Sequence, residues 1–171
     1  MTPAEFKTIR ESLGLSAQWL ADAVHVDQRT VRRWEDGAIP LRADIVELLT
    51  RLDAQMDADV ATALKDWLDD QSRVVAIDTA GRRLADTVAA LDGLLESRSP
   101  EDWPVVEVPR VDADVTADHT KASPESSVPG LDRPLPASFH RATAIRLRTL
   151  VGGRLRITYT ACPEMKEAHS L

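Results

Sequence analysis

The sequence LGLSAQWLADAVHVDQRTVRRWEDG, residues 13–37, contains two helix start signals in close succession. Ser16 can accept a hydrogen bond from the free amides of a helix that ends near Val24, and Asp27 can do the same for a helix that ends near Asp36. Apolar residues follow each signal at helical spacing. Because two short helices joined by a few residues form a helix-turn-helix, this stretch predicts that motif.

A further helix is predicted in front of the motif. Thr2 can cap a helix that begins at Pro3, and Glu5 is placed to complete a capping box with Thr2. Gly14 and Gly37 are placed to end the first and the third helix, because glycine accepts the left-handed conformation that ends many helices. The local signals therefore agree on the boundaries of three helices.

Residues 13–37 resemble the Cro-type, lambda-repressor-like (Xre) DNA-binding domain in their spacing of Leu-Ala, Val, Thr-Val, Trp-Glu and Gly. The resemblance covers residues 1–52. It implies a domain of four or five helices, in which the fourth helix starts after Pro40 and continues through Leu52. It also implies that the third helix is the one that enters DNA.

Two positions depart from the pattern of that family. His25 occupies the turn position where relatives usually have glycine, so it must adopt or avoid a left-handed backbone conformation. Gln18 is displaced by one residue, behind Ala17, from the position at which many relatives contact a phosphate. The fold prediction does not depend on either residue, whereas the phosphate contact does.

After residue 52, apolar residues continue at helical spacing over 56–68 on a strongly acidic segment, so we expect one extended helix there. It would belong to a helical connector over 53–98. Residues 73–77 are mostly β-branched and fit a short strand, but helical spacing resumes over 84–95, so 78–81 can instead be a simple break between helices.

Residues 99–171 predict a small α/β lobe. Residues 105–111 can form a strand, 137–151 a helix that the next two glycines end, and 155–159 a strand of alternating apolar and polar residues. Residues 112–136 are acidic and rich in serine and proline, which is typical of a loop or linker. The predicted fold class is mainly α: an N-terminal four- or five-helix lambda-repressor-like domain, a long helical connector and a small C-terminal α/β lobe.

This order of elements is also similar to that of the dimeric autoregulators that accompany anti-CRISPR genes in phages. That resemblance rests on weaker motifs than the first one. It implies a homodimer joined through the C-terminal lobe.

The composition argues against several other classes of protein. Among the 171 residues, the longest aliphatic run, 74–77, is far shorter than the roughly 20 residues of a membrane-spanning helix. The start of the chain lacks the pattern of a signal peptide, so we expect a cytoplasmic protein with no membrane contact. Cys162 is the only cysteine and the four histidines are scattered, so we expect no disulfide, metal site or cofactor. Nucleophile, base and orienting residues do not occur at a known catalytic spacing, so we do not expect an enzyme.

The net charge of −7 conceals a basic run on the third helix, which contains Arg29, Arg32 and Arg33. Helical geometry places these arginines opposite the apolar Val31 and Trp34. An α-helix fits the major groove of DNA, and arginine can donate two hydrogen bonds to guanine. We therefore predict base contacts by Gln28, Arg29 and Arg33, and phosphate contacts by Arg32, Gln18, Ser16 and Thr30. The alternative is an ordinary solvated surface helix.

The sequence is best interpreted as a transcription regulator, a repressor or autorepressor that binds double-stranded operator DNA as a homodimer. The alternative is an antitoxin-like interaction protein, whose segment 112–136 and C-terminal lobe cover a protein partner. The two interpretations are compatible, because antitoxins often repress their own operon. A neighbouring gene of toxin-like composition would favour the alternative.

Overall fold

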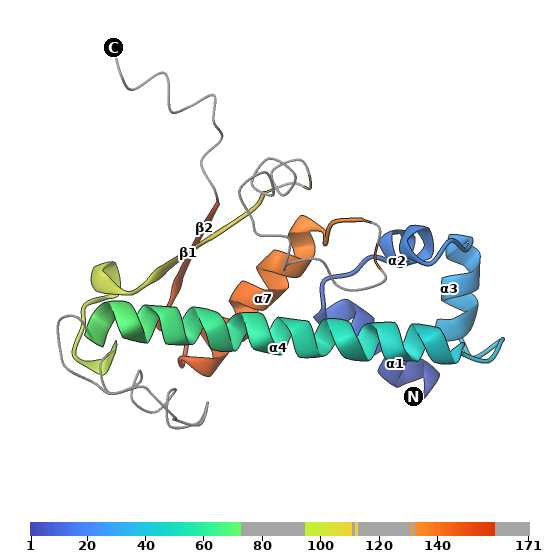
Figure 1. Cartoon of the computed structure of the whole chain (residues 1–171), viewed down its shortest axis with the longest axis horizontal. Helices are drawn as coiled ribbons and strands as arrows, with labels where there is room; N and C mark the ends of the chain where they lie inside the picture. The colour runs from blue at the N-terminus through green and yellow to red at the C-terminus, as the bar shows by residue number, and fades with distance from the viewer. Residues whose placement is uncertain (73–94, 111, 113–130, 132, 160–171) are drawn as a thin grey trace, which may run out of the picture.

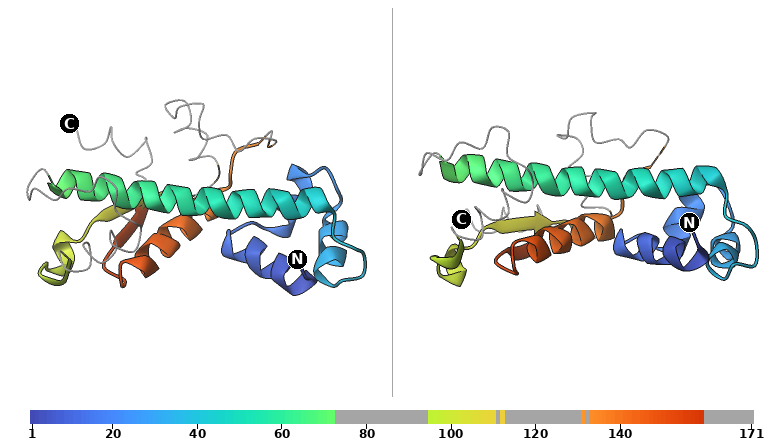
Figure 2. Two further views of the ribbon diagram at one scale, coloured as in Figure 1. Left: turned by 60° about the horizontal axis from the view of Figure 1, so that its bottom comes forward. Right: turned by 90° about the horizontal axis from the view of Figure 1, so that it is seen from below.

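The computed structural model is mainly helical, and a small parallel sheet lies in the half of the molecule opposite the N-terminal helices (Figure 1). One long helix forms a layer of its own, and the other elements lie along one side of it (Figure 2). The predictions made for 73–81 and for most of 84–95 and 112–136 lie outside the described residues. The described residues are 1–72, 95–110, 112, 131 and 133–159.

The three N-terminal helices have the predicted boundaries. They are α1 (Pro3–Ser12), α2 (Ala17–Ala23) and α3 (Gln28–Glu35). The capping box of α1 is present: the Thr2 hydroxyl accepts a hydrogen bond from the Glu5 amide at 3.2 Å, and the Glu5 carboxylate accepts one from the Thr2 amide at 2.6 Å. The hydrogen bond that the Thr2 amide donates is the main cause that lowers the pKa of the Glu5 carboxyl.

The caps of α2 and α3 are formed by the residues that the sequence predicted. Ser16 Oγ accepts a hydrogen bond from the Trp19 amide at 3.0 Å, and Asp27 Oδ1 accepts one from the Arg29 amide at 2.7 Å. Each cap satisfies an amide that has no partner inside its helix. The helix-turn-helix therefore begins and ends at positions set by neighbouring side chains.

The turn between α2 and α3 contains a residue with positive φ that is not glycine. His25 has φ 53°, close to the φ values of 69° and 70° at Gly14 and Gly37. His25 thus adopts the left-handed conformation at a position where proteins with the Cro-type pattern usually have glycine. A residue with a Cβ pays for this conformation, whereas glycine does not.

The long helix α4 (Ala43–Ser72) has 30 residues and confirms the extended helix that the spacing of apolar residues predicted. It starts beside the N-terminal helices and reaches the C-terminal sheet (Figure 1). The helix is continuous across residue 52, where the sequence suggested the end of the DNA-binding domain. In the described part of the chain, no helix combines the length and apolar character needed to cross a membrane.

The C-terminal elements are the 3-10 helix η1 (Pro100–Asp102), strand β1 (Val105–Val108), helix α7 (Ala137–Leu150) and strand β2 (Arg156–Tyr159). The strands pair in parallel, with Val105 opposite Arg156 and Val108 opposite Tyr159. β1 ends at Val108 and is therefore shorter than the strand predicted over 105–111. Gly152 and Gly153 follow α7 with positive φ, as expected for residues that end a helix.

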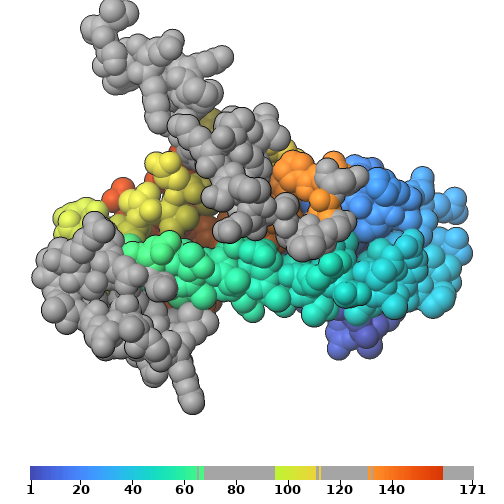
Figure 3. Space-filling model, in the orientation of Figure 1, coloured from blue at the N-terminus to red at the C-terminus, as the bar shows by residue number. Residues whose placement is uncertain are grey.

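Buried side chains form two clusters along α4. The first cluster packs α1, α2 and α3 against the half of α4 up to Met56, and the second packs the other half against the C-terminal elements. Phe139 of α7 belongs to the first cluster and is fully buried there. The start of α7 also touches the turn after α1, since a Cβ added at Gly14 would lie 2.4 Å from the Ser138 carbonyl oxygen. Phe139 of the C-terminal lobe therefore completes the N-terminal core, and in the space-filling view the orange part of the lobe lies beside the blue N-terminal helices (Figure 3).

Candidate DNA-binding surface

Helix α3 lies at the end of the molecule that is farthest from the sheet (Figure 1). Its inner side is apolar: Val31 and Trp34 are 0% and 2% exposed. The Trp34 ring meets Phe6 of α1 edge to face, with ring centroids 6.1 Å apart. This packing determines which side of α3 faces outward.

The outer side of α3 has the three arginines that the sequence singled out. Arg29, Arg32 and Arg33 are all exposed. Within the described part of the chain, none of their guanidinium groups donates a hydrogen bond or forms an ion pair. A row of free guanidinium donors on a helix is suited to phosphate oxygens and to the edges of guanine bases. Asp36, at the end of α3, is exposed as well.

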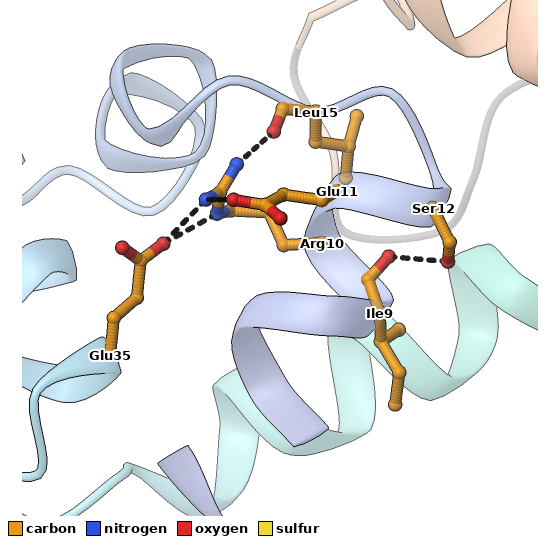
Figure 4. A network of polar contacts seen from close by, with 6 residues as sticks. All are labelled: Ile9, Arg10, Glu11, Ser12, Leu15 and Glu35. Atoms are coloured by element: carbon orange, nitrogen blue, oxygen red, sulfur yellow. Dashed lines mark hydrogen bonds and ion pairs between the residues drawn. The ribbon is translucent and has the colours of Figure 1, made fainter. Parts of the chain in front are cut away.

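A buried ion pair connects α3 to α1. The Arg10 guanidinium donates to Glu35 Oε1, with Nε 2.7 Å and Nη2 2.6 Å from that oxygen (Figure 4). Arg10 also donates to the carbonyl of Leu15 and lies 3.2 Å from Glu11. Because Arg10 neutralises Glu35 inside the domain, the outer side of α3 keeps the charge of its arginines.

Sequence reasoning missed this pair, although one signal was available. Arg10 follows Phe6 by four residues and precedes Leu13 by three, so it shares their side of α1. A charged residue on an apolar side indicates a buried partner. The identity of that partner depends on how α1 and α3 pack.

The remaining residues predicted to bind DNA surround α3 without forming one cluster. The Ser16 hydroxyl caps α2, and Gln18 donates from Nε2 to Asp22 Oδ1 at 2.6 Å. Gln28 and Thr30 are half-buried on the first turn of α3. The Gln18 amide has a second N–H that can donate to a phosphate while the first donates to Asp22, and Ser16 can cap α2 and still donate its hydroxyl proton.

A contact from the C-terminal part of the chain also reaches the motif. Arg133, which precedes α7, donates from Nη1 to the carbonyl of Trp19 and lies 3.4 Å from Asp22 Oδ2. Its guanidinium is 5.7 Å from the centre of the Trp19 ring. All three contacts are to α2, so residue 133 helps to position the helix that precedes α3. No local sequence signal indicates this contact.

The described residues also line an apolar pocket of about 270 Å³, partly open to solvent, between α4, β1 and α7. Trp67, Leu95 and Val106 are among the residues that line it, and its lining has no charged side chain. In the described ranges, no group of three His, Cys, Asp or Glu side chains is arranged to bind a metal ion. Compared with this pocket, the positive charge concentrated on α3 indicates more directly what kind of ligand the protein binds.

Comparison with known proteins supports this interpretation of the N-terminal helices. Residues 4–63 match the model of a family described as a helix-turn-helix domain. The match extends past residue 52 into the middle of α4, in agreement with the continuity of that helix. A search with the chain among curated proteins found no match. Residues 4–63 therefore form a helix-turn-helix DNA-binding domain of the Cro type.

Proposed function

We propose that this protein is a sequence-specific transcription regulator, a repressor that binds operators, including its own, as a homodimer. The observation that supports this proposal most directly is the exposed row of Arg29, Arg32 and Arg33 on α3. The opposite side of the same helix is buried, so the arginines are held on a rigid element. A rigid helix with outward arginines presents a fixed pattern of donors to the major groove.

Each residue of the surface has a specific role in this proposal. Arg29 and Arg33, one turn apart on α3, donate to guanine bases, and Gln28 contacts a base at the start of the helix. Arg32 contacts the phosphate backbone, and Ser16, Gln18 and Thr30 provide further phosphate contacts. Base contacts supply the preference for one sequence, whereas phosphate contacts supply affinity for any DNA.

A homodimer follows from the size of the surface. One short recognition helix makes few base contacts, so tight and specific binding requires a second copy on a second half-site. Two half-sites about one helical turn apart, ~34 Å, would be read together by a twofold dimer. A dimer bound over a promoter blocks RNA polymerase sterically, and this needs no catalytic group from the protein.

The experiment is a footprint of the full chain on the DNA upstream of its own gene, repeated at several salt concentrations. We expect one protected site made of two related half-sites. A variant in which Arg29, Arg32 and Arg33 are all replaced by alanine is the control, and it should remain folded but protect nothing. Uniform weak binding to all DNA, equal for the protein and this variant, would contradict the proposal.

A further inference from the structure

The small C-terminal sheet has an open edge at β2. The Arg156 amide donates to the Pro104 carbonyl at 2.9 Å, and Arg156 is opposite Val105 in the parallel register. In a parallel ladder the backbone groups of alternate residues point to the same side, so those of Arg156 and Thr158 point toward β1. The amides and carbonyls of Ile157 and Tyr159 point to the other side. Among the described residues, no strand lies there.

The apolar face of the sheet continues to this open edge. Paired residues share a face, so Ile157 and Tyr159 lie on the same face as Val106 and Val108. Val108 is 2% exposed, whereas Ile157 is 36% and Tyr159 is 53% exposed, although the Arg110 guanidinium lies 5.0 Å from the centre of the Tyr159 ring. The described chain therefore covers Val108 almost completely and the apolar side chains of β2 only in part.

A parallel sheet of two strands with an open edge is smaller than the parallel sheets that proteins usually contain. Parallel strands normally occur in larger sheets with both faces covered, and a two-stranded sheet is marginally stable alone. An uncovered edge with apolar side chains is a surface on which another strand can pair. All four residues of β2 are exposed, which leaves the whole strand accessible to a partner.

We propose that β2 pairs antiparallel with β2 of a second copy of this chain, around a twofold axis at Thr158. In that register Ile157 lies opposite Tyr159 of the second copy, and the outward amides and carbonyls of both residues are all satisfied. The result is a continuous sheet of four strands. The inference rests on the proposed homodimeric function and identifies the surface that joins its two copies.

The chemistry of β2 favours a second copy as the partner. The pairing places a β-branched side chain against an aromatic one and threonine against threonine, and both are favourable cross-strand pairs. The charged residue of the strand, Arg156, would lie ~14 Å along the strands from Arg156 of the second copy, too far for strong repulsion. The same contact covers part of the surface that Ile157 and Tyr159 expose in the monomer.

The first test is a disulfide across the proposed axis. In a Cys162→Ser background, Thr158→Cys places two thiols on a cross-strand pair whose Cα atoms would be about 4.5 Å apart, within disulfide range. Glu107→Cys is the matched control, because Glu107 is exposed and pairs with Thr158 inside one chain, one strand away from the axis. We expect mild oxidation to link most of the Thr158→Cys protein into dimers and to leave Glu107→Cys monomeric. Equal linking of both variants, or of neither, would overturn the proposal.

The second test uses proline to remove single amides from the edge. Ile157→Pro removes an amide that points outward, so the ladder between β1 and β2 keeps its hydrogen bonds. We expect the dissociation constant of the dimer, measured by sedimentation equilibrium, to rise at least about tenfold with little change in unfolding. Thr158→Pro instead removes an amide that faces β1 and should destabilise the lobe itself. If Ile157→Pro remains as dimeric as the parent chain, another surface joins the copies.

These outcomes separate the interface from the function. A monomeric Ile157→Pro protein should still bind a single half-site weakly through α3. If the parent protein is dimeric through another surface and still protects its operator, only the interface proposal fails. If the β2 dimer forms but no variant binds DNA specifically, the regulatory function fails and the interface stands.

Discussion

The two ends of the molecule are stabilised in different ways. In the N-terminal domain, α1, α2 and α3 each start at a side-chain cap that accepts a hydrogen bond from an amide two or three residues away. In the C-terminal lobe, β1 pairs with a strand from a distant part of the sequence, and the first amide of α7, that of Ala137, donates at 2.8 Å to Asp112 Oδ1, 25 residues earlier. Local signals therefore define the first region, and long-range contacts define the second. Phe139 joins the two regions, because it lies in the lobe by sequence and in the N-terminal core by position.

The largest expected effect comes from removing that link. Phe139→Ala should lower the free energy of unfolding by about 3–5 kcal/mol, because it leaves a cavity in a closed apolar core. Native-state hydrogen exchange should show the loss in α1, α2 and α3 as well as in α7. Ile145→Ala, on the same helix but 59% exposed, is the control and should change stability by less than about 0.5 kcal/mol. Unchanged protection of α1 to α3 in Phe139→Ala would show that the two regions are independent.

A slightly smaller effect is expected inside the N-terminal domain. Arg10→Met leaves Glu35 without its partner at a position where the side chain is 10% exposed, so unfolding should become easier by about 3 kcal/mol. Urea denaturation measures the loss of stability, and adding Glu35→Leu should recover much of it. The exposed pair of Arg42 and Asp44 is the contrast, since solvent screens it and Arg42→Met should change the stability much less than Arg10→Met.

The arginines of α3 should affect binding without affecting folding. Arg29→Ala and Arg33→Ala should each weaken operator binding by about 1–3 kcal/mol and relax the preference for a guanine. Arg32→Ala should weaken binding to all sequences and reduce the slope of affinity against salt by about one unit. Gel shifts on operator and scrambled DNA distinguish the two patterns. If all three variants bind operator like the parent protein, α3 is not the recognition helix.

The smallest effect concerns His25, the one position where the N-terminal domain departs from a local rule. Since His25 has φ 53°, His25→Gly should relieve about 1 kcal/mol of strain, partly offset by the greater freedom of glycine in the unfolded chain. Thermal unfolding should therefore show a small rise in melting temperature. A clear fall would contradict the strain argument. If the imidazole contacts a phosphate instead, His25→Gly should weaken operator binding in gel shifts, whereas relief of strain alone should leave that affinity unchanged.

The sequence by itself determined the helices of the N-terminal domain and the exposed side of α3. Caps, terminal glycines and helical spacing depend on residues that are only a few positions apart. They can therefore be recognised in short stretches of sequence. The same spacing predicted the extended α4 and the helix and second strand of the lobe. It also identified the three arginines, because a helix with Val31 and Trp34 buried must turn them outward.

Only the tertiary structure decided which distant surfaces meet. It placed Phe139 in the N-terminal core, paired Arg10 with Glu35 across 25 residues of sequence, and set Arg133 against Trp19 and Asp22. An apolar or charged side chain on a buried side shows that a partner is needed, but it does not identify that partner. Burial is non-directional and depends on the packing of whole elements, so local patterns predict the elements of this protein and not the contacts between its two regions.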